Sequence, residues 1–122
     1  MTSALPVLDF NVLEKLSRFN SSGTSLDLAL VKLFIESSVL EFDSLTSTNT
    51  LKLSEISDRA HALKSSSASI GLIFLSNLCE HLESEAENNH DLRPVLLNIK
   101  LAVQDAIEAL KKYVKIKSTK AS

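Results

Sequence analysis

The sequence predicts an all-α protein, an antiparallel up-down bundle of four helices preceded by a short extra N-terminal helix. Four long segments place apolar residues at steps of three and four, which is the spacing of one face of an α-helix. Only two glycines and two prolines interrupt the 122 residues, so helix-breaking positions are few. The links between the segments are short, which favours antiparallel neighbours. No segment shows strand alternation or an internal repeat, so residues 1–122 are expected to form a single domain.

Polar residues mark the ends of the predicted helices. Asp9 and Asp91 each offer a side-chain acceptor to the first turn of a helix, and Thr24 or Ser25 does so for the second helix. Cap-type and β-branched residues from Thr46 to Thr50 separate the second helix from the third. The expected bounds are about 9–19 for the accessory helix, about 25–46, 51–69, 72–88 and 91–116 for the bundle, and 117–122 for a basic tail.

The third predicted helix has a clear core-facing stripe. Its members recur at steps of three and four, at Leu53, Ile56, Ala60, Leu63, Ser67 and Ile70. The second helix has a similar stripe but carries three further leucines on another side, at Leu26, Leu33 and Leu40. That helix therefore has more apolar surface than one bundle seam requires.

Composition excludes several classes of function. The formal net charge of −2 gives no broad positive field for nucleic acid or an anionic membrane. The single cysteine, Cys79, excludes an intrachain disulfide and a multi-cysteine zinc site. The apolar run from Ile70 to Leu75 is far shorter than the roughly 20 residues of a membrane span, and the N-terminus lacks the pattern of a signal peptide. We therefore expect a soluble cytoplasmic protein.

His61 is predicted to lie on the surface of the third helix. At about 100° per residue it falls roughly 120° from the centre of the core stripe. Lys64 and Ser65 lie on the same side, because residues three and four apart are neighbours on a helix. An exposed imidazole titrates at about pH 6.5, so near neutral pH much of it is a free nitrogen nucleophile. Lys64 would supply a cation for a phosphoryl group, although a lone surface histidine is more often only a solvated residue.

The segment HALKSSSASIG, residues 61–71, resembles the signature of histidine-containing phosphotransfer (HPt) domains of multistep phosphorelays. The family pattern is approximately His-x-Leu-Lys-Gly-Ser-Ser-Ala-x-(Leu, Ile or Val)-Gly within a four-helix bundle. Residues 78–83, LCEHLE, are similar to the next helix of the family. The resemblance implies that His61 is the phosphoacceptor, Lys64 the electrostatic helper and Ser65 a small docking position. Ser65 departs from the usual glycine, and its extra bulk could narrow the set of partners.

The resemblance also implies a mechanism and partners. The aspartyl phosphate of a receiver domain is attacked by a ring nitrogen of His61, and the phosphohistidine then donates to the aspartate of another receiver. The partners implied are response-regulator receivers and an upstream hybrid histidine kinase. The bundle itself needs no ATP, metal or other cofactor, because Mg²⁺ is expected on the receiver. A monomer would leave the docking face free, and the chain is either a free-standing carrier or a piece of a larger kinase.

Other residues have two interpretations each. Glu83 lies level with His61 if the helices are antiparallel about Gly71, so it orients the imidazole or is simply solvated. Gly71 is expected to ease the turn after the third helix, and it is also counted among the residues for receiver docking. Leu26, Leu33 and Leu40 form an apolar floor for a docked receiver or seal the accessory helix against the bundle.

Competing sites are weaker. Glu87-x-x-His90 and Asp58-x-x-His61 approximate the spacing of di-iron ligands in helical bundles, but His61 points outward and His90 follows the end of its helix. Cys79 lies on a core stripe, so it cannot pair with His61 as a nucleophile. The lysines at positions 111, 112, 115, 117 and 120 are expected to be a solvated tail that complements the helix dipole. The main alternative function is an adaptor bundle that docks a partner without carrying phosphate.

Overall fold

The computed structural model describes residues 6–21, 23–46 and 52–120, which form five helices and one short β-hairpin joined by short links. The predicted all-α class is therefore correct. The predicted break between Thr46 and Thr50 falls mostly outside the described residues. In chain order the elements are α1 Phe10–Leu16, β1 Asn20–Ser21, β2 Thr24–Ser25, α2 Leu26–Thr46, α3 Leu53–Ser69, α4 Ile73–Glu87 and α5 Arg93–Lys120.

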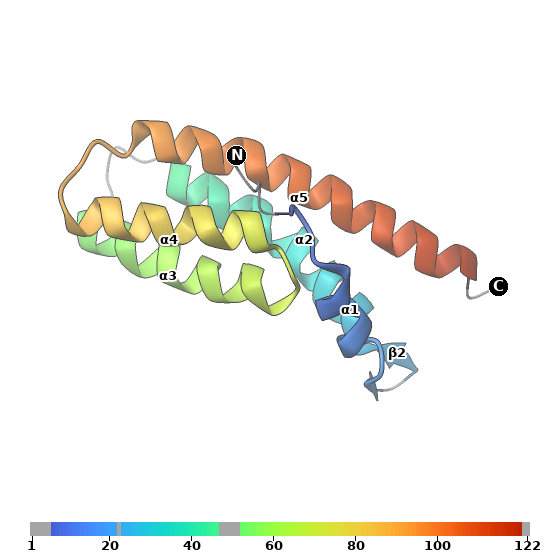
Figure 1. Cartoon of the computed structure of the whole chain (residues 1–122). Coiled ribbons are helices and arrows are strands. Elements are labelled where there is room, and N and C mark those ends of the chain that lie inside the picture. The colour runs from blue at the N-terminus through green and yellow to red at the C-terminus, as the bar shows by residue number, and fades with distance from the viewer. Residues whose placement is uncertain (1–5, 22, 47–51, 121–122) are drawn as a thin grey trace.

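The four long helices lie alongside one another, with α1 and the hairpin at one end (Figure 1). The most extensive packing is between α3 and α4, which a tight turn connects. α5 contacts both α4 and α2, whereas α2 and α3 touch only slightly. The loose α2–α3 seam leaves grooves between these two helices, one of which is lined by Leu33, Ser37 and Ser66.

The core contains most of the predicted apolar stripes. On α3 the stripe from Ile56 to Ile70 is buried, but Leu53 in the first turn is 38% exposed. Leu53 was expected in the core, and its exposure follows from its place at the helix end, beside a surface pocket between α3 and α4. The other buried stripes are Val31, Phe34, Ser38, Phe42 and Leu45 on α2, Leu75, Cys79, Leu82 and Ala86 on α4, and Ile99, Val103, Ala106 and Leu110 on α5.

The β-hairpin was not predicted. Asn20 pairs with Ser25 and Ser21 with Thr24 in an antiparallel register, and Gly23 has a φ of +80° within the turn. Each strand has two residues, which is too short for any alternation of apolar and polar residues to show in the sequence. The hairpin leads directly into α2.

Gly71 lies buried in the turn between α3 and α4, where there is no room for a side chain. Its φ is +84°, a conformation that side chains strongly disfavour. A Cβ atom here would lie 2.6 Å from the backbone oxygen of Asp9 and 3.2 Å from Cβ of Val12. The Asp9 amide also donates to the Gly71 carbonyl at 2.7 Å. Gly71 thus joins the chain before α1 to the α3–α4 turn, and it lies beneath the surface rather than on a docking face.

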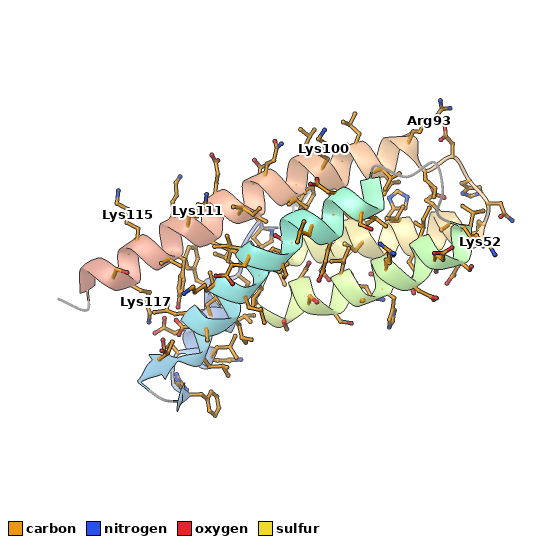
Figure 2. The ribbon with its side chains drawn as sticks, turned by 180° about the vertical axis from the view of Figure 1, so that it is seen from behind. Lys52, Arg93, Lys100, Lys111, Lys115 and Lys117 are labelled. Carbon is orange, nitrogen blue, oxygen red and sulfur yellow. The ribbon has the colours of Figure 1, made fainter. Side chains whose placement is uncertain are left out.

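The last turns of α5 differ from the predicted tail. The helix continues to Lys120, and Lys117 is only partly exposed, with its Nζ 3.7 Å from the buried Asp27 carboxylate of α2. Tyr113, also buried, donates its hydroxyl to the same carboxylate. In Figure 2, Lys117 points toward the start of α2, whereas Lys111 and Lys115 point away from the bundle. These tertiary contacts explain why the helix extends further than its apolar spacing indicates.

Asp27 keeps its charge in spite of burial. Burial alone would raise the pKa of this carboxyl, but hydrogen bonds from Ser25, Tyr113 and the Leu28 backbone, together with the Lys117 ammonium, hold the pKa below its ordinary value. The same burial and the facing carboxylate raise the pKa of Tyr113. Within the described part of the chain, no helix is long and apolar enough to span a membrane.

Candidate functional site

His61 projects from the outer face of α3. Its side chain is 62% exposed, while Ala60 and Leu63 on the opposite side of the helix are buried in the core. The imidazole therefore lies where the helical spacing predicted it. An exposed ring of this kind can be reached directly by an atom of another protein.

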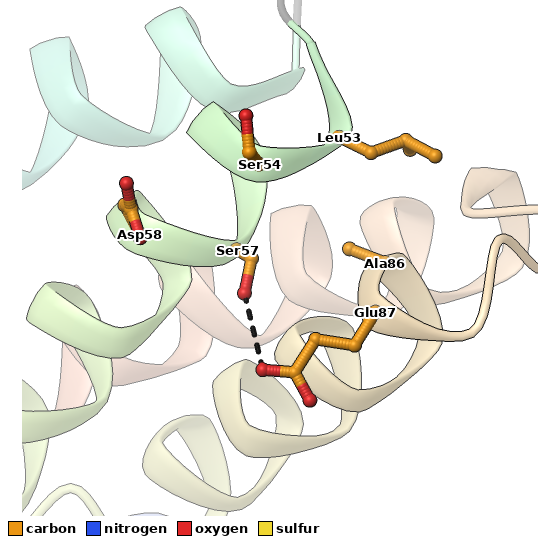
Figure 3. A pocket seen from close by; sticks show the side chains of 6 residues that line it. All are labelled: Leu53, Ser54, Ser57, Asp58, Ala86 and Glu87. Carbon is orange, nitrogen blue, oxygen red and sulfur yellow. Dashed lines mark hydrogen bonds between the residues drawn. The ribbon is translucent and has the colours of Figure 1, made fainter.

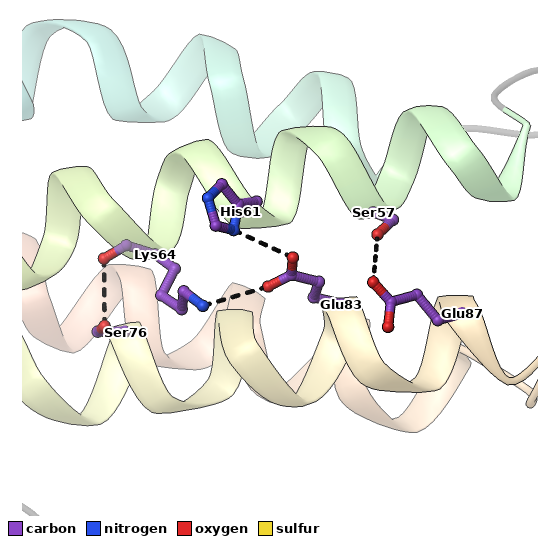
Figure 4. Close-up of polar contacts among 6 residues, drawn as sticks. All are labelled: Ser57, His61, Lys64, Ser76, Glu83 and Glu87. Atoms are coloured by element: carbon purple, nitrogen blue, oxygen red, sulfur yellow. Dashed lines mark hydrogen bonds and ion pairs between the residues drawn. The ribbon is translucent and has the colours of Figure 1, made fainter.

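Glu83 of α4 holds one ring nitrogen of His61. Its Oε2 lies 3.1 Å from Nδ1, and its side chain is only 20% exposed (Figure 4). An ionised carboxylate can only accept, so Nδ1 carries the hydrogen in this contact, and in the neutral ring Nε2 then has the free lone pair. The sequence placed Glu83 level with His61 through the tight turn at Gly71, and the structure has the two side chains in contact.

Lys64 reaches the same carboxylate from the next turn of α3. Its Nζ donates to Oε1 of Glu83 at 3.3 Å, and its side chain is 28% exposed. Glu83 thus bridges the imidazole and the ammonium. The backbone at Lys64 is held as well, because the Ser76 hydroxyl of α4 donates to its carbonyl at 3.1 Å. This part of α3 is thus fixed to α4 at Glu83 and at Ser76.

Small residues follow His61 along the exposed part of α3. Ser65, one turn further along α3, is exposed. Ser66 and Ser69 donate their hydroxyls to carbonyl oxygens of α3 itself, at 3.1 Å to Ala62 and 2.7 Å to Ser66. Because these side chains fold back on their own helix, they leave a low surface beside the imidazole.

Leu33 and Leu40 of α2 are 59% and 74% exposed. They therefore do not seal α1 against the bundle, which was one of the two predicted interpretations, while Leu26 is half-buried. Leu33 lines a groove that also contains Ser66 and Ser69 of α3. The exposed apolar surface of α2 is thus continuous with the serine side of α3.

Comparison with protein families decides the assignment. A family model described as the Hpt domain matches residues 29–113, more than half of the chain. The chain belongs to the Hpt domain family. Hpt domains are phosphocarrier modules of phosphorelays, where they work with receiver domains and histidine kinases and have no kinase activity of their own. No curated protein and no solved structure matches the chain.

The described part of this Hpt domain holds three other groups that could carry chemistry, Cys79, His81 and His90. Cys79 is buried, and burial raises the pKa of its thiol to about 12, so the nucleophilic thiolate is not available at neutral pH. His81 and His90 both contact Glu85 at the end of α4, and hydrogen bonding from His90 holds the pKa of that carboxyl below its ordinary value. Among the described residues, no three potential ligands converge on a metal position.

Two features near the candidate site of the Hpt domain were missed in the sequence. Ser76 is one, because a hydroxyl that donates to another helix's backbone has no periodic signal. The other is a second polar pair between α3 and α4, in which Ser57 donates to Glu87 at 3.5 Å. Ser57 precedes His61 by four residues, and Glu87 follows Glu83 by four residues. The antiparallel alignment that pairs His61 with Glu83 therefore also predicts the pair of Ser57 with Glu87.

Proposed function

We propose that this Hpt domain accepts a phosphoryl group on His61 from the aspartyl phosphate of one receiver domain and passes it to the aspartate of another. The observation that carries the proposal is an exposed imidazole whose Nδ1 is held by Glu83 while Nε2 remains free. An imidazole needs no further deprotonation to act as a nucleophile in this form. The four long helices, taken as an up-down bundle, serve as the rigid support.

The proposed phosphoryl transfer needs no additional proton donor or acceptor. The Nε2 lone pair of His61 attacks phosphorus in line, the bond from phosphorus to the aspartyl oxygen breaks, and the aspartate leaves as a carboxylate. The ring becomes a phosphorylated imidazolium with its hydrogen still on Nδ1. Glu83 stabilises that positive charge, as a carboxylate does for the histidine of a catalytic triad. The reverse sequence delivers the group to the next receiver.

Lys64 supplies the only cation of the bridged cluster. Its ammonium neutralises Glu83 in the resting state and lies one helical turn from His61, within reach of phosphoryl oxygens. Most of the charge stabilisation is expected from the receiver, which would hold Mg²⁺, so this chain is proposed to bind no metal and no nucleotide. It would act as a monomer in the cytoplasm between a hybrid histidine kinase and a response regulator.

The test is transfer of labelled phosphate. Receiver domains from the source organism, phosphorylated with radiolabelled acetyl phosphate, should label the wild-type chain with an acid-labile and base-stable phosphate. His61→Gln should abolish the label. His81→Gln is the matched control, because His81 is equally exposed and also contacts a glutamate. If His61→Gln takes up as much label as the wild type, the proposal is wrong, and receiver binding without any label would favour the adaptor function.

A further inference from the structure

A surface pocket lies between α3 and α4, one helical turn from His61. We call it the 57/87 pocket, and its lining is Leu53, Ser54, Ser57, Asp58, Ala86 and Glu87. Figure 3 shows Ser57 and Glu87 pointing toward each other, with Ala86 and Leu53 alongside. The lining therefore combines an apolar wall with two carboxylates and two hydroxyls. This composition suits a side chain with an apolar stem and a cationic end.

The two carboxylates of the pocket have no cation of their own. Within residues 6–21, 23–46 and 52–120, Glu87 has only the Ser57 hydroxyl at 3.5 Å, and no ion pair involves Asp58. Some other acidic groups do have a cation, such as Glu83 with Lys64 and Asp91 with Arg93. Among the described residues, Asp58 and Glu87 thus bring two carboxylates without an ion-pair partner to one pocket, on the α3 N-terminal side of His61.

The pocket lies inside the area that any partner of His61 must cover. Ser57 precedes His61 by four residues, which is about 6 Å along a helix. Glu87 follows Glu83 by the same number of residues. A protein interface of standard size covers about 800 Å² on each partner, equivalent to a disc of about 16 Å radius. A receiver whose aspartate reaches Nε2 of His61 therefore also lies over the pocket.

We propose that the 57/87 pocket receives a lysine or arginine side chain of the receiver that docks on His61. The methylene stem would lie against Leu53 and Ala86, and the charged end would meet Asp58 and Glu87. This inference rests on the proposed function and adds a specificity determinant to it. Receivers with a basic residue at the matching position dock faster, and receivers with an acidic residue there are rejected.

The experiment reverses the charge and separates docking from chemistry. Glu87→Lys is compared with Glu108→Lys, which makes the same change on the exposed surface of α5. Each protein is phosphorylated by the small donor phosphoramidate and, separately, by a labelled receiver. We expect Glu87→Lys to lower kcat/KM with the receiver about fivefold at low salt, with a smaller loss at high salt, as for a rim ion pair. Labelling by phosphoramidate should not change.

The outcomes are distinct. Recovery of the rate when the facing basic residue of the receiver is changed to glutamate would establish the pairing. A loss no larger than that of Glu108→Lys, or an equal loss with phosphoramidate, would overturn the inference while leaving His61 as the phosphoacceptor. If neither donor labels the wild type, the proposed function fails instead. The pocket is then tested by the dissociation constant of the unphosphorylated receiver, which Glu87→Lys should raise and Glu108→Lys should not.

Discussion

The Tyr113 hydroxyl near the end of α5 donates a hydrogen bond to the Asp27 carboxylate at the start of α2, and both side chains are buried. The contact joins residues 86 positions apart in the sequence. Phe10 of α1 packs against the same tyrosine, with 6.2 Å between ring centroids. The Lys117 Nζ lies over the Tyr113 ring, 5.8 Å from its centroid. One buried charge therefore organises the end of the molecule where α1, α2 and α5 meet.

Lys117→Met should destabilise the protein by about 1 kcal/mol. The change removes the cation that faces a buried carboxylate, and the partial exposure of Lys117 reduces the cost below that of a fully buried pair. The measurement is the free energy of unfolding in urea. Lys111→Met is the control on the solvent side of α5 and should change it by less than about 0.5 kcal/mol. Equal values for both variants would show that Asp27 does not need the Lys117 ammonium.

Asp27→Asn should reduce the loss of stability in acid. The pKa of this carboxyl is lower in the folded protein than in the unfolded chain, so near pH 4 the unfolded chain takes up the proton more readily. The stabilisation is complete above the unfolded pKa and disappears as the pH falls through the folded value. Urea unfolding between pH 7 and pH 3 should show a smaller decline for Asp27→Asn than for the wild type. Parallel curves would exclude Asp27 as a source of the acid sensitivity.

Gly71→Ala should cost about 3 kcal/mol of stability. Alanine must adopt a positive φ and its Cβ must move the Asp9 backbone, which adds a packing penalty to the conformational one. Gly23→Ala is the matched control, since Gly23 has nearly the same φ but open space around it, and it should cost only about 1 kcal/mol. Thermal or urea unfolding of the two variants separates the close approach from the backbone conformation.

Glu83→Leu should slow phosphorylation of His61 about tenfold, as is usual when a partner that orients a reactive histidine is lost. Glu83→Gln keeps an acceptor for Nδ1 but loses the charge, so its rate should lie between Glu83→Leu and the wild type. The initial rate of labelling by phosphoramidate measures the effect without docking. Glu80→Leu, on the exposed side of α4, serves as the control. An unchanged rate in Glu83→Gln and Glu83→Leu would mean that the contact does not orient the ring.

Leu33→Ala and Leu40→Ala should weaken receiver binding without loss of stability. Both side chains are more than half exposed, so their truncation should alter the free energy of unfolding by less than about 0.5 kcal/mol. Leu101→Ala on the outer face of α5 is a matched control, because Leu101 is 52% exposed and lies on another helix. Calorimetric titration with a receiver should show a higher Kd for the α2 variants alone. An equal effect of all three changes would argue against a docking role for α2.

The sequence predicted the helices and the exposed position of His61 because both depend on helical periodicity. The spacing of Ala60 and Leu63 fixed the core side of α3, and that in turn placed His61 outside. The position of Glu83 beside His61 was predicted from one further step, the antiparallel return of the chain at Gly71.

The features that were missed depend on contacts between distant residues. Asp27 has the appearance of an ordinary polar residue in the first turn of a helix, and only the arrival of Tyr113 and Lys117 makes its burial favourable. Lys117 therefore could not be distinguished from the neighbouring solvated lysines. The exposure of Leu53 depends on its place in the first turn of α3, beside the surface pocket, which the spacing of the apolar stripe does not indicate.

The contact between Glu83 and His61 has a consequence for how the proposed phosphohistidine forms and is consumed. A phosphoryl group on Nε2 leaves the Nδ1 hydrogen in place, so the modified ring keeps the same contact with Glu83 that the free ring has. Loading and unloading then need no change of rotamer and no rearrangement of α3 or α4. The His61 side chain would keep one orientation while the phosphoryl group is transferred to and from it. The direction of phosphoryl transfer would then be set by the two receivers rather than by this chain.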